Sequence, residues 1–235
     1  MTVPMFDEIP LATEQRRVRD AYGFSFALVL LATLGLIAAG SPMVSPMALL
    51  AVVMQFGALL ITLRVSGFHH RWGRGVALGV ALVVLASVIG GPLIFESGRF
   101  VALGGWIVLL AITVFAIARR LVTYTEVTIP LLMGLLVIYM LIGLMFAGGY
   151  QLADLLSPPG MKPEGQGISG AIYFSFITLA TLGYGDVTPA NNVVRALAVA
   201  EALVGQLYLV SVVSLAVSRL RYRRPAETVE QPDQE

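Results

Sequence analysis

Cysteine is absent from this chain of 235 residues, so disulfide frameworks and cysteine-based metal sites are excluded. Histidine is nearly absent too, and the two that occur, His69 and His70, are too few for a recognisable metal cluster. Charged residues make up 12% of the sequence, against about 25% in soluble domains. Nothing in the sequence indicates an organic cofactor, a nucleic-acid partner or a small-molecule substrate.

Hydrophobic residues, in contrast, make up 57% of the chain, and the mean hydropathy is +0.86. Uninterrupted apolar runs of about 20 residues are typical of helices that cross a lipid bilayer. The pattern predicts an all-α membrane protein with six transmembrane helices per chain and one short re-entrant segment. The expected spans are 22–40, 46–64, 76–95, 101–119, 127–149 and 192–218.

The placement of basic residues indicates how the chain crosses the membrane. If both termini are cytoplasmic, twelve arginines fall on the inner side: Arg16, Arg17, Arg19, Arg64, Arg71, Arg74, Arg119, Arg120, Arg219, Arg221, Arg223 and Arg224. Only Arg99, Lys162 and Arg195 fall outside. Because basic residues favour cytoplasmic loops, we expect cytoplasmic segments at 1–20 and 221–235, the latter disordered. We expect the membrane to be a bacterial inner membrane.

One hexapeptide, Thr181-Leu182-Gly183-Tyr184-Gly185-Asp186, follows a short apolar run at 169–180 that cannot cross the membrane. A cation gives up its water shell only where oxygens replace it, and backbone carbonyls that all face one side of a strand supply them. Gly183 and Gly185 permit the backbone angles that this arrangement needs. Thr181 adds a hydroxyl oxygen, Tyr184 is expected to brace the strand, and Asp186 is expected to place a carboxylate at the outer mouth.

The hexapeptide and its flanking segments resemble the selectivity filter of the tetrameric potassium channels. The resemblance implies a pore domain at 121–220, with an outer helix at 127–149, a pore helix at 169–180, the filter at 181–186 and an inner helix at 192–218. It also implies a homotetramer in a lipid bilayer, with four filters around one pore and K+ as the conducted ion. The implied K+ ligands are Thr181, Leu182, Gly183 and Tyr184.

The resemblance extends into the inner helix. Gly205 lies 24 residues after Thr181 (205 − 181), where members of the family commonly carry a hinge glycine. The family register then implies four residues that face the conduction path: Gln206, Leu209, Val213 and Val217.

The residues behind the filter depart from the family pattern. Ile177 stands where some members carry a carboxylate that pairs with the filter aspartate. The pair Tyr173-Phe174 replaces two tryptophans. We expect Tyr173 to support the pore by offering its hydroxyl to Tyr184, whereas Phe174 can only pack.

Thr178 and Glu201 are two further candidates for supporting the pore. Glu201 lies within the last apolar segment, where an unpaired acid costs about 2.5–3.5 kcal/mol. In one interpretation, it attracts cations or braces the pore helix through a hydrogen bond. In the other, it lies near the outer interface or pairs locally, for example with Arg195.

Residues 21–120 are expected to form a four-helix transmembrane domain without a voltage sensor. A voltage sensor needs charges inside the membrane field, commonly an arginine or lysine at every third position of the fourth helix. Residues 104–118 carry no charge, and Arg119 and Arg120 come only at the cytoplasmic end. We expect this domain to pack around the pore, stabilise the tetramer or contact lipid.

The sequence therefore predicts a potassium-selective channel that conducts passively, is not voltage-gated and is not an enzyme. The nearest alternative is a weakly selective cation channel of the same architecture. A membrane transporter or enzyme in which the glycine–tyrosine–glycine loop occurs by chance is a more distant one. No cluster of nucleophiles, bases or metal ligands accompanies the loop, and only one half of the chain carries an interrupted segment.

Overall fold

The computed structural model describes residues 9–39, 46–65, 75, 79, 96–122, 129–165 and 167–221. The helices are α1 (Ile9–Ala39), α2 (Pro46–Val65), α4 (Glu96–Leu121), α5 (Ile129–Leu156), α6 (Gly167–Leu179) and α7 (Asn192–Arg221). Two short strands, β1 (Met161–Lys162) and β2 (Thr188–Pro189), pair antiparallel. The predicted third span at 76–95 lies outside the described residues apart from position 79, as does the tail beyond Arg221.

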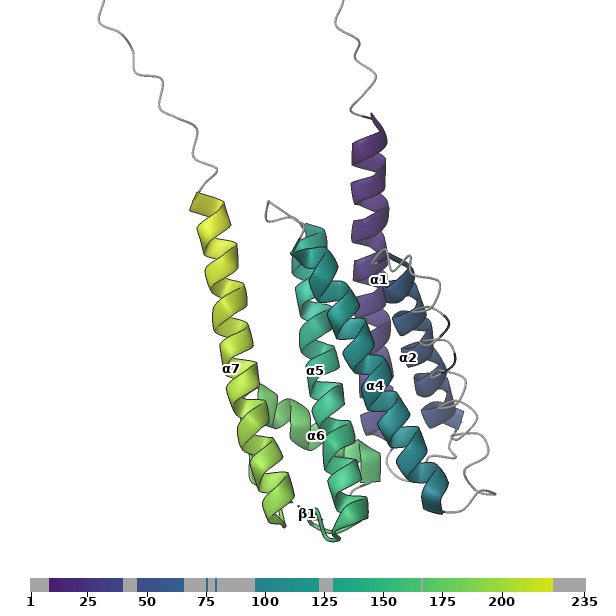
Figure 1. Cartoon of the computed structure of the whole chain (residues 1–235), viewed down its shortest axis with the longest axis vertical. Helices are drawn as coiled ribbons and strands as arrows, with labels where there is room; N and C mark the ends of the chain where they lie inside the picture. Colours follow the sequence, from purple (N-terminus) through teal and green to yellow (C-terminus); the bar gives the residue numbers. More distant parts are fainter. Residues whose placement is uncertain are drawn as a thin grey trace, which may run out of the picture.

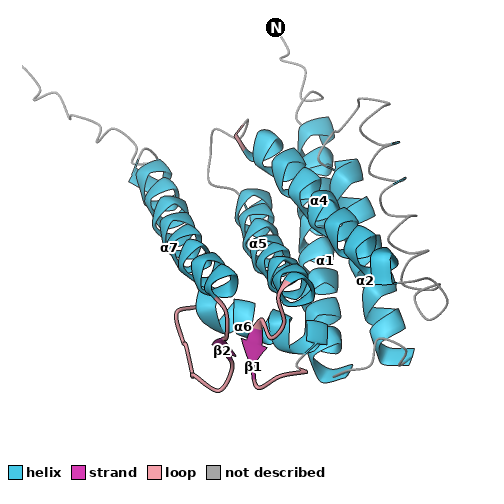
Figure 2. Ribbon diagram, turned by 60° about the horizontal axis from the view of Figure 1, so that its bottom comes forward, coloured by secondary structure: helices cyan, strands magenta, loops and turns pink. Residues whose placement is uncertain are grey.

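The long helices run side by side along one axis, and the short helix α6 lies between α5 and α7 at one end (Figure 1). Helix α1 packs against α2, α5 and α6, while α4 packs against α5 and α2. The strands β1 and β2 lie next to α6 and the beginning of α7 (Figure 2). The start of α1 and the end of α7 both lie at the opposite end of the bundle, on different sides of it (Figure 1).

Helix α5 is the centre of the bundle, and α7 is at its edge. Val137, Leu141 and Leu144 on α5 are fully buried, because α1, α4, α6 and α7 all contact that helix. On α7, in contrast, Leu203 and Leu207 are 60% and 67% exposed. A single chain therefore leaves much of the apolar surface of α7 uncovered.

Two helices of the described part are long and apolar enough to cross a membrane by length and composition: Leu131–Leu156 in α5 and Asn192–Val212 in α7. Shorter apolar helices occur at Ala21–Gly35 in α1 and Leu103–Arg119 in α4. The first helix begins at Ile9, earlier than the expected span at 22–40, and α5 continues to Leu156, past the expected end at 149.

The ends of the helices around the hexapeptide follow from local sequence. Helix α5 ends before Ser157-Pro158-Pro159, because proline cannot continue the helical hydrogen-bond pattern. Helix α7 begins after Asn191, whose side-chain Oδ1 accepts a hydrogen bond of 2.9 Å from the Val194 backbone N–H, as a helix cap does. Ser169 lies in the first turn of α6, and its hydroxyl donates to the Ile37 carbonyl of α1 at 2.9 Å.

Candidate ion-conducting site

The C-terminal end of α6 holds the beginning of the hexapeptide through backbone hydrogen bonds. The Thr181 N–H donates to the Thr178 carbonyl at 2.9 Å. The N–H groups of Leu182 and Gly183 both donate to the Ile177 carbonyl, at 2.8 and 3.2 Å. Because these donors lie in three consecutive residues, the direction in which the chain leaves the helix is fixed.

The backbone of the hexapeptide has positive φ at every second residue. The φ angles are +59° at Thr181, +52° at Gly183 and +79° at Gly185. In a regular strand, successive carbonyls point to opposite sides, and an alternation of left-handed and ordinary residues turns them towards one side. Glycine takes positive φ without a steric penalty, whereas a residue with a Cβ such as Thr181 loses about 1–2 kcal/mol there. Strain of this kind persists where the surrounding structure enforces it, and it is common at functional sites.

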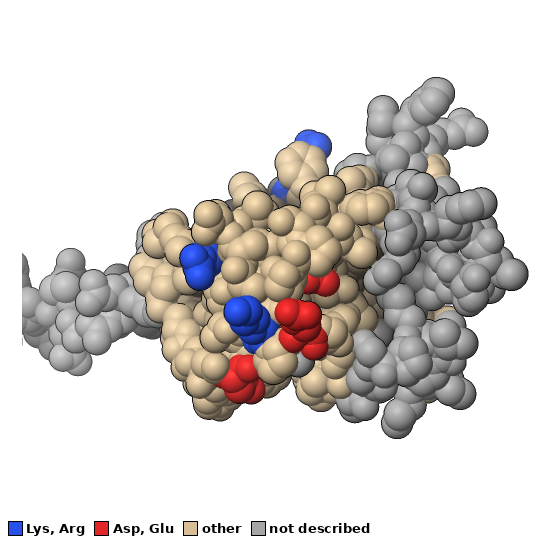
Figure 3. All heavy atoms as spheres, turned by 90° about the horizontal axis from the view of Figure 1, so that it is seen from below, with Lys and Arg blue, Asp and Glu red and all other residues tan. Residues whose placement is uncertain are grey.

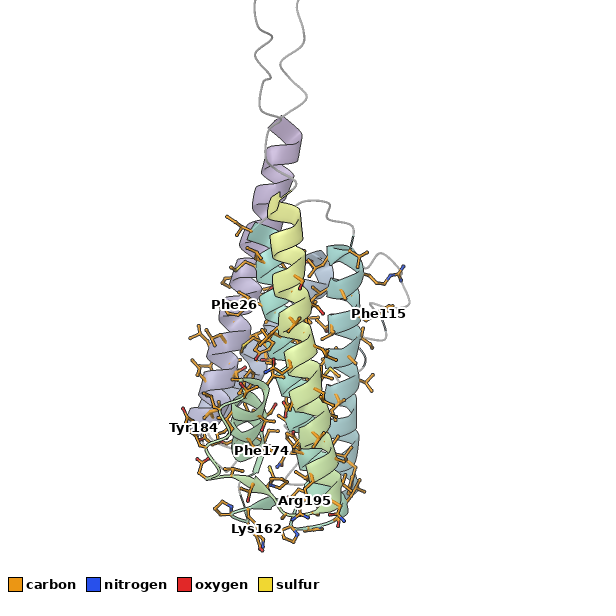
Figure 4. All side chains as sticks on the ribbon, turned by 90° about the vertical axis from the view of Figure 1, so that its left-hand side faces the viewer. Phe26, Phe115, Lys162, Phe174, Tyr184 and Arg195 are labelled. Carbon is orange, nitrogen blue, oxygen red and sulfur yellow. The ribbon has the colours of Figure 1, made fainter. Side chains whose placement is uncertain are left out.

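The hexapeptide lies on the surface of the single chain. Leu182 is 57% exposed and Tyr184 is 68% exposed. Figure 4 shows Tyr184 on the outer side of the bundle, beside the lower part of α6. Within the described part of a single chain, the ring of Tyr184 is therefore largely uncovered, and its expected role in bracing the strand stays a prediction.

Asp186 is bonded to α6 through Tyr173. The Tyr173 hydroxyl donates to Asp186 Oδ2 at 2.7 Å, and Asp186 Oδ1 accepts from the Val187 backbone N–H at 3.0 Å. The hydrogen bond from Tyr173 holds the pKa of the Asp186 carboxyl below its ordinary value. The sequence led to the expectation that this hydroxyl reaches Tyr184; in the single chain it donates to Asp186 instead.

The chain on the far side of the hexapeptide is tied back to the end of α5. The Ala190 N–H donates to the Gly160 carbonyl at 2.8 Å, and the Asn191 side-chain amide donates to the Ser157 carbonyl at 2.7 Å. The Gly160 N–H in turn donates to Asp154 Oδ1 at 2.6 Å. An added Cβ at Gly160 would lie 2.9 Å from the Asp154 Cα, so this tie requires glycine.

Charged groups of both signs are present around this end of the molecule, on a surface that is otherwise uncharged (Figure 3). Lys162 and Arg195 both lie at this lower end (Figure 4). Within the residues that the structure describes, no group of three or more histidine, aspartate or glutamate residues could hold a metal ion.

Gly205 on α7 is in close contact with the end of α6. An added Cβ would lie 2.8 Å from Leu179 Cδ1 and 3.2 Å from the Leu179 carbonyl oxygen. A Cβ here would force the Leu179 side chain to move, so glycine favours this packing whether or not the residue is also a hinge. Two of the expected cavity residues, Gln206 and Leu209, are exposed in the single chain. The other two, Val213 and Val217, lie on α7, but their side chains are outside the described part.

Two tyrosines, Tyr139 and Tyr208, join the helices at this level. The Tyr139 hydroxyl on α5 donates to the Leu179 carbonyl at 3.1 Å, and the Tyr208 hydroxyl on α7 donates to the Leu135 carbonyl at 2.5 Å. Their ring centroids are 5.9 Å apart. A tyrosine in an apolar helix needs a partner for its hydroxyl, and this requirement was the available signal in the sequence.

Glu201 is fully buried, and its carboxyl group is hydrogen-bonded to the hydroxyls of Tyr150 on α5 and Ser175 on α6. Arg195 is exposed and bonds to the Asn192 side chain at 3.4 Å. Glu201 thus bonds to α5 and α6 rather than to Arg195. Thr178 is half-buried, and its backbone carbonyl holds the N–H of Thr181.

Helix α4 has no charged residue between Leu103 and Ala118. Arg119, at the end of the helix, lies with its guanidinium carbon 5.6 Å from the centroid of the Phe115 ring, in a cation–π contact. Phe115 lies in the upper half of the molecule, away from Lys162 and Arg195 (Figure 4).

Comparison with known proteins agrees with this geometry. Residues 135–222 match a family model described as "Ion channel". The matched segment begins within α5, contains α6 and the hexapeptide, and continues through α7. No curated protein and no solved structure matches the chain. The family match supports an ion channel of the potassium-channel type and, together with the apolar helices, an integral membrane protein rather than an enzyme.

Proposed function

We propose that this protein is a potassium-selective channel in which four chains surround one pore. The observation that carries the proposal is the alternation of positive φ at Thr181, Gly183 and Gly185, in a segment that leaves a short helix between two membrane-spanning helices. Such a backbone turns a row of carbonyls to one side, which is what a dehydrated cation needs.

In this proposal, K+ binds the backbone carbonyls of Thr181, Leu182, Gly183 and Tyr184 and the hydroxyl of Thr181. Gly185 and Asp186 shape the outer mouth, where four copies of the ionised Asp186 concentrate cations. The hydrogen bond from Tyr173 supports this role, because it favours the ionised form of the carboxyl group. The negative end of the α6 dipole at Leu179 favours a cation in the cavity below.

A homotetramer is supported by what one chain leaves uncovered. One hexapeptide supplies one row of carbonyls, and a cation in a closed filter is surrounded by several rows. The ring of Tyr184 is 68% exposed, and Leu203 and Leu207 on α7 are 60% and 67% exposed. Four copies around an axis beside α7 would cover these groups, with Gln206 and Leu209 towards the cavity and Gly205 as a hinge of the inner helix.

The orientation is proposed from the charges and from the position of the helix ends. The start of α1 and the end of α7 lie at the same end of the bundle, opposite the hexapeptide (Figure 1). With that end in the cytoplasm of a bacterial cell, the filter opens to the outside. Voltage gating is not part of the proposal, because α4 carries no charge between Leu103 and Ala118.

Two measurements test the proposal, one for assembly and one for selectivity. Cross-linking of the purified protein in detergent should give a ladder that ends at four chains. In liposomes, an outward K+ gradient should drive uptake of a tracer of K+ or Rb+, and an equal Na+ gradient should not. Equal uptake with both gradients would indicate the alternative, a weakly selective cation channel. A monomer without any uptake would favour a transporter, an enzyme or a subunit that needs a partner.

A further inference from the structure

A chain of hydrogen bonds passes through the interior of the protein behind the hexapeptide. Glu201 on α7 contacts the Tyr150 hydroxyl through Oε2 and the Ser175 hydroxyl through Oε1. The Ser175 Oγ also lies 2.6 Å from the Gly143 carbonyl oxygen on α5. Glu201, Ser175 and Tyr150 are all fully buried. The outer, pore and inner helices are thus joined through polar atoms that have no access to water.

The number of hydrogen atoms available for these hydrogen bonds indicates whether the carboxyl group of Glu201 is protonated. Three contacts between oxygens need three hydrogens, and each hydroxyl supplies one. A carbonyl oxygen accepts only, so the contact of Ser175 with Gly143 uses the serine hydrogen, and the contact of Tyr150 with Oε2 uses the tyrosine hydrogen. The remaining contact, between Oε1 and Ser175, has a hydrogen only if the carboxyl group carries it.

The surroundings of Glu201 also favour the protonated, neutral carboxyl group. An ionised carboxylate in an apolar interior needs a cationic partner, and a neutral acid needs only hydrogen bonds. In the described part of the chain, no arginine or lysine pairs with Glu201, and Arg195 bonds to Asn192 instead. The titratable groups that face Glu201 are Tyr150 and Tyr139, both on α5.

The position of Ser175 connects this chain of bonds to the filter. Ser175 directly precedes Phe176 and Ile177, whose carbonyls accept from the N–H groups of Ala180, Leu182 and Gly183. A shift of this turn of α6 would therefore move the first residues of the hexapeptide. Gly143 permits the close approach of the helices, because an added Cβ there would lie 3.0 Å from the Phe176 ring.

We propose that Glu201 is a positioning residue of the filter that works as a neutral carboxylic acid: it donates to Ser175, which donates to Gly143, and it accepts from Tyr150. This inference rests on the proposed channel function for its effect on conduction, but not for the protonation of Glu201. The residue does not touch the ion path and does not attract cations by its charge. It fixes the pore helix between its two neighbours.

Infrared difference spectroscopy tests the protonation directly. Spectra of the full-length protein in lipid at neutral pH should contain a carboxylic-acid C=O band that disappears in Glu201→Gln. The matched control is Glu164→Gln, an exposed acid in the outer loop, which should leave that band unchanged. A wild-type spectrum without an acid band that depends on Glu201 would overturn the proposal.

Conduction tests the positioning role. Glutamine is neutral, its amide donates to Ser175 and its oxygen accepts from Tyr150, so Glu201→Gln should keep the wild-type K+/Na+ permeability ratio and conductance. Glu201→Leu and Ser175→Ala interrupt the chain of hydrogen bonds. Each should lower the permeability ratio about tenfold, which corresponds to the loss of one buried hydrogen bond to an acid. A Glu201→Gln channel with reduced conductance would indicate an ionised Glu201 and would contradict the inference.

The two proposals fail in different ways. If the wild-type protein conducts no K+, the channel function fails, while the infrared band still decides whether Glu201 is protonated. If the wild type is selective and Glu201→Leu is equally selective, the channel stands and the positioning role of Glu201 is refuted.

Discussion

Replacing Gly183 by alanine should abolish K+ selectivity through backbone strain alone. Gly183 has φ of +52°, and no atom lies within 4 Å of the position that an added Cβ would take. A clash within the chain therefore does not contribute. The cost is that of a residue with a Cβ in the left-handed region, about 1–2 kcal/mol per chain. In a tetramer the four copies add to roughly 4–8 kcal/mol, enough for the filter to leave this conformation.

The control for this prediction is Gly165→Ala in the outer loop. Gly165 has φ of +78° and an equally open surrounding, so the substitution introduces the same kind of strain outside the filter. Both variants should lower the melting temperature of the assembled protein, but only Gly183→Ala should bring the K+/Na+ permeability ratio close to one in planar bilayers. The reasoning is refuted if Gly183→Ala keeps the wild-type ratio, or if Gly165→Ala loses selectivity to the same extent.

Three further predictions concern the surroundings of the filter. Tyr173→Phe removes the hydrogen bond that holds the pKa of Asp186 below its ordinary value of 3.8. A carboxyl group with a lowered pKa stabilises the folded protein above its ordinary pKa, and this contribution is lost as the pH falls through the pKa in the folded protein. Without the hydrogen bond, Asp186 is protonated at a higher pH, so the variant should lose current at a higher pH than the wild type in an acid titration. Identical titrations would contradict this prediction. Gly205→Ala should destabilise the protein by about 1–3 kcal/mol, since the Cβ would lie 2.8 Å from Leu179 Cδ1. In a double-mutant cycle measured by thermal denaturation, Gly205→Ala should cost less stability in the Leu179→Ala background than in the wild type. Equal costs in both backgrounds would argue for a hinge without a packing role. Finally, currents should show no steep voltage dependence. One charge that crosses the full field contributes about 2.3 kcal/mol per 100 mV, and α4 carries no charge between Leu103 and Ala118. A steep activation curve in a voltage-step recording would contradict the proposal that the channel is not voltage-gated.

The parts of the fold that depend on local sequence could be predicted from the sequence. The apolar runs predicted helices at the positions of α5 and α7, and the shorter run predicted α6, because hydropathy and length are properties of a segment alone. The glycine spacing led to the expectation of unusual backbone angles, and φ is indeed positive at Gly183 and Gly185. Thr181 shares this conformation, which its side chain does not suggest.

The contacts that the sequence did not reveal depend on which faces of the helices meet. Tyr173 bonds to Asp186 and not to Tyr184 because the outer end of the hexapeptide turns back over α6, a direction set by several long-range hydrogen bonds. The partners of Glu201 on α5 and α6 lie 51 and 26 residues away, and no local pattern links them. Buried hydroxyls in apolar helices were the signal that such partners exist, without indicating which ones.

Helix α1 links the N-terminal part of the chain to α5 and α6. This helix packs against α5 and α6, and the Ile37 carbonyl near its end accepts from the Ser169 hydroxyl in the first turn of α6. That the domain at 21–120 packs around a pore stays a prediction. In the proposed channel, this contact would hold α6 without requiring a voltage sensor.

The central claim, a K+-selective pore formed by this chain, is tested most directly by the reversal potential of the purified protein in a planar bilayer with K+ on one side and Na+ on the other. Each tenfold preference for K+ equals about 1.4 kcal/mol, which corresponds to roughly 60 mV when one charge in a 100 mV field is worth 2.3 kcal/mol. The account predicts a reversal potential displaced by at least that amount in the direction of K+ permeation. A current that reverses near zero would contradict it.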